Sequence, residues 1–114
     1  MNTLRNSVQL VGHLGKDPEV TDLDKGKKLA RVSMAVNEYY TSAKGEKTSN
    51  TQWVNLIAWD KKAEYLSNHL VKGNEVMVQG KLSSRSYEDK SGQTKYVTEI
   101  VVNEVYKINR PKED

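Results

Sequence analysis

The sequence predicts an all-β protein, a five-stranded Greek-key barrel with one short helix between strands three and four. Two observations lead to this class. Five stretches rich in Val, Ile, Leu, Thr and Tyr are separated by polar segments that contain turn residues, and only one segment between them has the apolar spacing of a helix. With 114 residues, the chain has room for one domain with one hydrophobic core.

The expected strands span residues 7–14, 29–40, 53–59, 75–87 and 95–106. Ala30, Val32 and Met34 share one face of the second strand. Arg31 lies on the other face, and this period of two gives one side of the strand to the core and the other to solvent. The fourth strand has the same period. Both strands are therefore expected to border a core on one side only.

One helix is expected between the third and fourth strands. Asp60 can cap its start. Ala63, Leu66 and Leu70 then fall on one face of the helix. Gly73, just beyond the last apolar residue, is a stop signal.

This order of elements is that of the OB-fold, a Greek-key barrel whose surface binds oligonucleotides or oligosaccharides. Gly12 and Gly80, inside the first and fourth strands, fit a barrel whose strands bend sharply, although either could mark a simple bulge. An open antiparallel sheet is the alternative. We expect one OB-fold domain over residues 1–108 and a short polar end over residues 109–114.

The composition excludes several classes of protein. The sequence has no cysteine, which excludes a disulfide framework, an iron–sulfur cluster, a thiol nucleophile and the usual structural zinc sites. The first residues, MNTLRNSVQL, have no apolar run long enough for a signal peptide or a membrane span. We therefore expect a cytoplasmic protein with no cofactor and no membrane association. The formal net charge of +3 is weak evidence for a polyanionic partner.

No set of residues suggests catalysis. His13 and His69 are the only histidines, lack the spacing of metal ligands and have no cysteine to complete a zinc site. The stretch VGHLGKD lacks the Gly-Lys-Ser/Thr ending of a phosphate-binding loop. Because catalysis needs a convergent set of groups, we expect a protein that is not an enzyme.

The tryptophans are the most informative residues. Trp53 and Trp59 share one face of the third strand, while Val54, Leu56 and Ala58 form an apolar face on the opposite side. The core therefore has its own apolar face without the indole rings. At about 3.3 Å per residue the two rings stand roughly 20 Å apart, a distance that several nucleotides could bridge. Aromatic rings beside cationic residues are typical of a surface on which single-stranded bases stack.

Two other functions remain open on the residues alone. The tryptophans could anchor a protein partner, in which case the OB-fold would be a structural or adaptor module with no affinity for oligo(dT). Stacking surfaces also do not distinguish ribose from deoxyribose, so an RNA-binding OB-protein is possible. Competition between oligo(dT) and oligo(U) separates the DNA-binding from the RNA-binding hypothesis.

Four stretches together resemble the bacterial single-stranded DNA-binding protein family. They are VGHLGKDPEV, NTQWVNLIAWDKKAEYL, LVKGNEVMVQGKL and YEDKSGQTKYVTEIVV, and the resemblance runs from about residue 4 to residue 107. It implies an OB-fold that assembles as a homotetramer. It also implies sequence-independent binding and protection of single-stranded DNA during replication, recombination and repair.

The resemblance also assigns site residues. The base-stacking aromatics that it implies are Tyr40, Trp53, Trp59 and Tyr87. The phosphate contacts that it implies are Lys61, Lys72 and Arg85, and Arg5 lies in the basic N-terminal region of the family without matching a motif residue.

The second strand holds one conflict between pattern and resemblance. Strand alternation favours Tyr39 as the stacking residue, because Tyr39 shares the polar face with Asn37. The resemblance favours Tyr40, which requires a twist or bulge near the end of the strand.

The sequence departs from the family pattern in three ways. Tyr40 and Tyr87 replace tryptophan, and Asn55 and Ser86 stand where many relatives carry a cation. The family commonly continues to an acidic tip ending in phenylalanine, whereas the sequence ends at NRPKED. Recruitment of replication and repair enzymes through such a tip is therefore doubtful.

Overall fold

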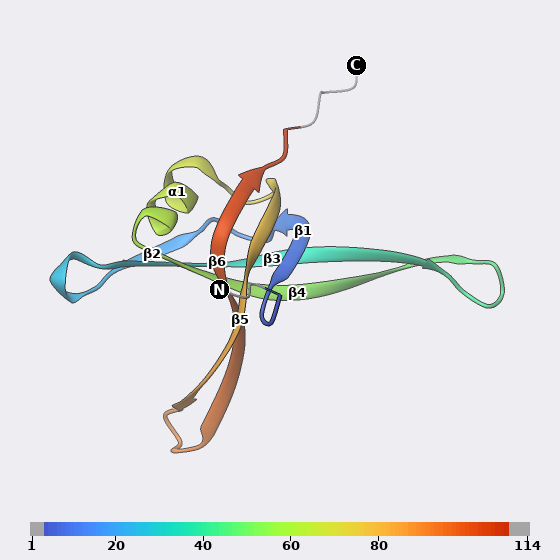
Figure 1. Cartoon of the computed structure of the whole chain (residues 1–114). Helices are drawn as coiled ribbons and strands as arrows, with labels where there is room; N and C mark the ends of the chain where they lie inside the picture. The colour runs from blue at the N-terminus through green and yellow to red at the C-terminus, as the bar shows by residue number, and fades with distance from the viewer. Residues whose placement is uncertain (1–3, 110–114) are drawn as a thin grey trace.

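A computed structural model describes residues 4–109 of the chain. Within these residues the chain forms six strands, a 3-10 turn and one α-helix, arranged as Figure 1 shows. In chain order they are β1 (Val8–Leu14), β2 (Glu19–Asp22), η1 (Asp24–Gly26), β3 (Lys28–Thr41), β4 (Lys47–Trp59), α1 (Lys61–His69), β5 (Glu75–Glu88) and β6 (Thr94–Lys107).

Five of the strands close into a barrel, which confirms the predicted OB-fold. The neighbours run β1-β5-β6-β4-β3, and a pairing of β1 with β3 closes the ring. Every pair is antiparallel except β4 with β6. At the closure Gly12 lies against the backbone carbonyl of Ala35, where a Cβ atom would collide with the oxygen. Gly80 lies at a bulge in the pairing of β5 with β6. Both glycines thus serve the bending of the barrel.

The core is formed by the inward faces of the strands and by one face of α1. The buried cluster includes Met34 and Leu56 from the barrel wall. The predicted helix face is confirmed, since Ala63, Leu66 and Leu70 are all buried in the same cluster. Each fully buried aliphatic side chain contributes about 1.5–3 kcal/mol of transfer free energy.

The structure corrects two predicted strand positions. A short strand, β2, pairs with the start of β3, so the helix lies between strands four and five rather than three and four. All four residues of β2 are exposed, and no apolar alternation marks them. The strand predicted to begin at Trp53 begins at Lys47. Residues 47–52 are polar and are extended because they pair with residues 36–41 of β3, a long-range effect that local composition does not report.

Asp60 also differs from the expectation. It occupies the N-cap position of α1, but its side chain makes no capping hydrogen bond. Its Oδ1 instead accepts a hydrogen bond of 3.2 Å from the backbone amide of Lys28. The carboxylate therefore ties the helix start to β3.

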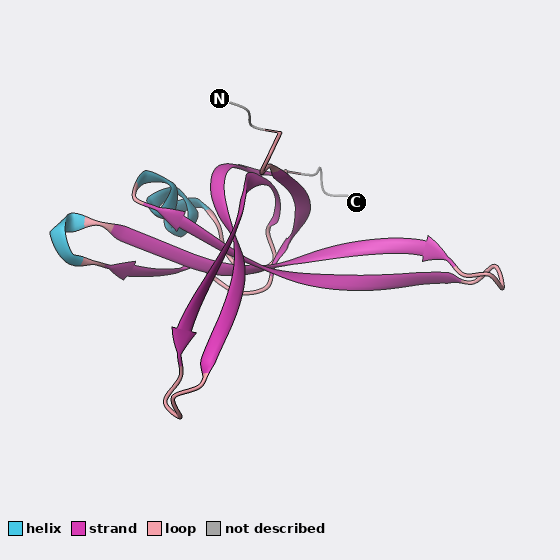
Figure 2. Cartoon of the chain, turned by 60° about the horizontal axis from the view of Figure 1, so that its bottom comes forward, coloured by secondary structure: helices cyan, strands magenta, loops and turns pink. Residues whose placement is uncertain are grey.

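Two hairpins project from the barrel in different directions. The β3–β4 hairpin extends to the right in Figure 1 and the β5–β6 hairpin extends downward. Figure 2 shows the same divergence from another side. The radius of gyration is 16.5 Å, against about 13 Å for a compact chain of this length, because residues in the two arms lie far from the centre.

No helix within residues 4–109 has the length and apolar character needed to cross a membrane. The polar end expected at residues 109–114 lies outside the described residues, apart from Asn109.

Candidate nucleic-acid interface

A groove runs between the outer face of the β3–β4 ribbon and the β5–β6 hairpin. It consists of two hollows that share three lining residues, Arg31, Arg85 and Glu99. Tyr87 lines the first hollow and Trp59 lines the second. Each hollow therefore has one aromatic ring in its lining, and the three charged side chains line both hollows.

Strand register explains why these residues meet. On the ribbon, Trp59 lies opposite Leu29, and Ile57 lies opposite Arg31. Residues directly opposite on an antiparallel pair point to the same face, so the cation of β3 and the indole of β4 share the outer surface. The groove-facing residues of the hairpin also share one face, since Glu99 pairs with Ser83 and residues 85 and 87 follow at a period of two.

Both tryptophans are exposed, as the stacking hypothesis requires. Trp53 is 65% exposed and Trp59 is 41% exposed. On the opposite face of β4, Leu56 and Ala58 are buried and Val54 packs against the core. Trp53 flanks the first hollow, because it lies two residues before Asn55, a lining residue, on the same face of β4.

Tyr87 and Arg85 act as one unit on the hairpin. The guanidinium carbon of Arg85 lies 5.9 Å from the centre of the Tyr87 ring, within the range of a cation–π contact. Arg85 Nε donates a hydrogen bond of 2.8 Å to Oε1 of Glu99, which is buried. This hydrogen bond and the charge of Glu99 raise the pKa of Arg85. Arg85 is thus held between a buried carboxylate and a half-exposed ring.

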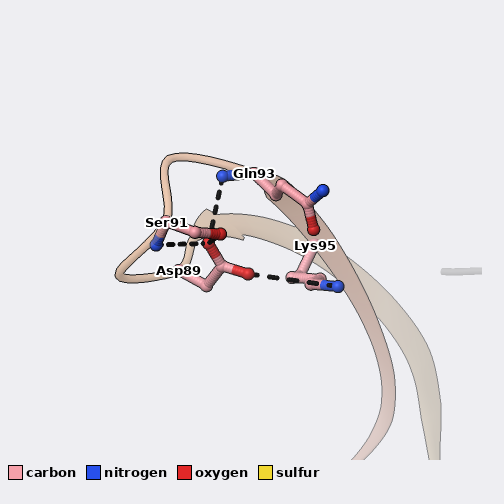
Figure 3. Close-up of polar contacts among 4 residues, drawn as sticks. All are labelled: Asp89, Ser91, Gln93 and Lys95. Atoms are coloured by element: carbon pink, nitrogen blue, oxygen red, sulfur yellow. Dashed lines mark hydrogen bonds and ion pairs between the residues drawn. The ribbon is translucent and has the colours of Figure 1, made fainter.

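The tip of the hairpin is ordered by Asp89, as Figure 3 shows. Oδ1 of Asp89 accepts hydrogen bonds from the amide and hydroxyl of Ser91 and from the amide of Gln93. Oδ2 lies 4.0 Å from Nζ of Lys95. The bonds from Ser91 and Gln93 lower the pKa of Asp89. They fix the turn that follows Tyr87 by two residues.

The bulge that would turn Tyr40 toward the Trp53 face is not present in the pairing of β3 with β4. Tyr39 lies opposite Ser49 and Tyr40 lies opposite Thr48, with no shift of register along the ribbon. Alternation therefore places Tyr39 on the Trp53 side of the arm and Tyr40 on the other side. Both rings are exposed, at 78% and 54% respectively. A base contact by Tyr40 stays a prediction.

The other cations implied by the resemblance lie outside the groove lining. Lys61 begins α1, two residues after Trp59. Lys72 lies in the loop before β5, where its backbone amide donates to Oδ1 of Asp17 at 2.8 Å. Arg5 is exposed, and it adjoins a segment tied to β5 because Asn6 bonds to the backbone there.

Three cations that line the groove were not among the predicted site residues: Lys16, Arg31 and Lys81. Arg31 lines both hollows. The alternation of its strand already placed it on the outer face. Its neighbours across the groove could not be read from the sequence, because they come from a hairpin more than fifty residues further along the chain. Register within β3 was the only available signal.

The fold and this groove define a class, that of OB-fold proteins with an exposed aromatic and cationic surface. The model of the "Single-strand binding protein family" matches residues 5–108. The chain belongs to this family.

Two kinds of relative support this assignment. A single-stranded DNA-binding protein 1 of Chlorobaculum tepidum is 38% identical over 101 residues, which are 88% of this chain and 62% of that protein. The chain thus spans about three fifths of this relative. The SSB of Plasmodium falciparum, solved in complex with ssDNA, superposes with a TM-score of 0.84 at 29% identity over 91% of this chain and 95% of that one.

The barrel also resembles a deletion mutant of the single-stranded DNA binding protein from Thermus aquaticus. The TM-score is 0.80 at 20% identity, over 91% of this chain and 50% of that one. At this identity the likeness supports the fold alone.

Proposed function

We propose that the chain binds single-stranded DNA without sequence preference and protects it, by stacking exposed bases on aromatic rings and by neutralising phosphates with lysine and arginine. The observation that carries the proposal is the groove, which is lined by Trp59, Tyr87 and cations and has the exposed Trp53 beside it. Unpaired bases offer flat apolar faces to such rings, whereas duplex bases already stack on one another.

The proposed contacts are those that the family resemblance implies, and three of them, Trp59, Tyr87 and Arg85, line the groove. The base-stacking residues are Tyr40, Trp53, Trp59 and Tyr87, and the phosphate contacts are Lys61, Lys72, Arg85 and Arg5. Each stacked base contributes about 1–3 kcal/mol by alanine substitution. Neutralising Z phosphates of a single strand gives a slope of about −0.7Z for log affinity against log salt. Stacking therefore dominates at high salt.

The chain is proposed to bind rather than to catalyse. The family model that matches the chain is that of single-strand binding proteins. We place the protein in the cytoplasm, where it serves replication, recombination and repair.

Assembly as a homotetramer is part of the proposal. Among the described residues, β1 pairs with β3 only at His13 and Leu14, so residues 8–12 leave one strand edge open within the protomer. Exposed strand edges are sites of pairing with another chain. Val11 on this strand is also 43% exposed.

A fluorescence titration tests the proposed function. Oligo(dT) is expected to quench the emission of the two exposed tryptophans on binding. Duplex DNA of equal length is the control and is expected to leave emission unchanged. Competition with oligo(U) distinguishes DNA from RNA as the preferred ligand. A folded protein that shows neither quenching nor binding with oligo(dT) would contradict the proposal.

A further inference from the structure

The charged residues of the groove are not equally available to a ligand. Four cations and two carboxylates line it. Glu99 is paired with Arg85 at 2.8 Å, and Glu19 is paired with Lys16 at 3.3 Å. Each carboxylate therefore offsets one cation of the groove.

Arg31 differs from these paired cations. It lines both hollows, and no ion pair within residues 4–109 includes it. Lys81, the fourth cation, lines only the second hollow. Arg31 is therefore the cation that reaches the whole groove with its charge not offset by a salt bridge.

The position of Arg31 also suits a backbone that crosses the groove. It lies opposite Ile57 on β4, which is only 9% exposed. On β2 it lies opposite Glu19, whose carboxylate forms its ion pair with Lys16 rather than with Arg31. Trp59 lies opposite Leu29. Leu29 precedes Arg31 by two residues on β3, a separation of about 7 Å along the strand. A guanidinium is a planar fork that matches the geometry of a phosphate.

We propose that Arg31 is the principal phosphate-binding residue of the groove. Arg85 contributes less to phosphate binding, because Glu99 offsets its charge and occupies its Nε. Arg85 acts in part as a positioning residue that holds the Tyr87 ring. This inference rests on the proposed function, since it requires a single strand whose bases stack on Trp59 and Tyr87.

The inference predicts a specific change in salt dependence. Losing one phosphate contact lowers the magnitude of the slope of log affinity against log salt by about 0.7. If the lines for wild type and Arg31→Gln converge near 1 M salt, the variant binds about eightfold more weakly at 50 mM and about threefold more weakly at 200 mM. Arg85→Gln is expected to change the slope by less than half as much.

The experiment measures the affinity of the full chain for oligo(dT) across this salt range. Arg31→Lys keeps the charge and is expected to keep the slope, which separates phosphate binding from a purely structural role. Lys107→Gln is the matched control, because it removes the same charge at the end of β6 farthest from the hairpin tip and is expected to leave the slope unchanged. Thermal unfolding of each variant checks that the fold is intact.

The possible outcomes separate the two proposals. An unchanged slope for Arg31→Gln, in a protein that still binds oligo(dT), overturns the inference and leaves the proposed function standing. An equal loss in Lys107→Gln, or a failure of Arg31→Lys to keep the slope, also overturns it. Absence of binding by the folded wild-type protein overturns both.

Discussion

The indole of Trp53 lies against the backbone of Gly15. A Cβ atom added at residue 15 would come within 2.6 Å of Cζ3 of the ring, and the amide of Gly15 donates a hydrogen bond of 2.9 Å to the carbonyl of Ser33 on β3. The ring is therefore supported along one edge by a fixed backbone while 65% of the residue stays exposed. Glycine at this position sets where the stacking surface lies.

Trp53→Ala is expected to weaken binding of oligo(dT) by about 1–3 kcal/mol, because it removes one stacking ring. The stability should change little, since the side chain is mostly exposed and the opposite face of β4 supplies the core. Affinity is measured by titration, using the remaining fluorescence of Trp59. Tyr96→Ala is the matched control: this ring is 79% exposed but lies on the hairpin face away from the groove. Equal losses in the two variants would contradict the stacking role.

Gly15→Ala is expected to weaken binding roughly three- to tenfold, part of the value of one stacked base, by displacing the Trp53 ring. Its hydrogen bond to Ser33 uses the backbone and persists. The measurement is a double-mutant cycle with Trp53→Ala. If Gly15 acts through the ring, the alanine at residue 15 adds no further loss when Trp53 is already absent. Additive losses would show that Gly15 acts independently of the ring.

The sequence predicted the barrel because its inward faces carry a clear period of two, as in Ala30, Val32 and Met34 of β3. It also predicted the exposed tryptophans, because Leu56 and Ala58 supply the apolar face of β4. Both predictions depend on alternation within one strand. Alternation is a reliable signal, because burial of one face of a strand requires apolar residues at every second position.

Other features depended on contacts that no local pattern contains. The polar start of β4 is a strand because it pairs with the end of β3. Arg31 and Arg85 line the same groove because two hairpins distant in sequence border it. The hydrogen bond that Oδ1 of Asp60 accepts from the amide of Lys28 similarly replaces the local cap that propensity favours. These features arise from tertiary contacts, so they can be predicted only when the order of the strands in the barrel is already known.

The two tyrosines near the end of β3 test whether family resemblance or strand alternation identifies the stacking ring. Tyr40→Ala is expected to weaken binding of oligo(dT) by about 1–3 kcal/mol, and Tyr39→Ala serves as its matched control. The two residues are adjacent, both are exposed, and both belong to the same arm, so differences in folding are small. A loss confined to Tyr39→Ala would move the stacking position to the face that Trp53 shares.

The hairpin tip is expected to respond to pH through Asp89. Hydrogen bonds from Ser91 and Gln93 lower the pKa of this carboxyl group in the folded state. Its ordering effect is therefore fully present above the unfolded-state pKa of about 3.9 and is lost as the pH falls through the lower folded-state value. Amide chemical shifts of Ser91 and Gln93 measured over this acidic range report the change.

Asp89→Ala should produce the same loosened tip at neutral pH. The affinity for oligo(dT) should then fall by about two- to threefold. The loosened segment beside Tyr87 must become ordered when DNA binds, and the entropic cost of this ordering weakens binding. Glu88→Gln, which removes the adjacent exposed carboxylate, is the control and should change neither the shifts nor the affinity. Amide shifts that stay constant in Asp89→Ala would show that the turn is ordered by its backbone bonds, from Asp89 to Gln93 and from Gly92 to Asp89, without help from the carboxylate.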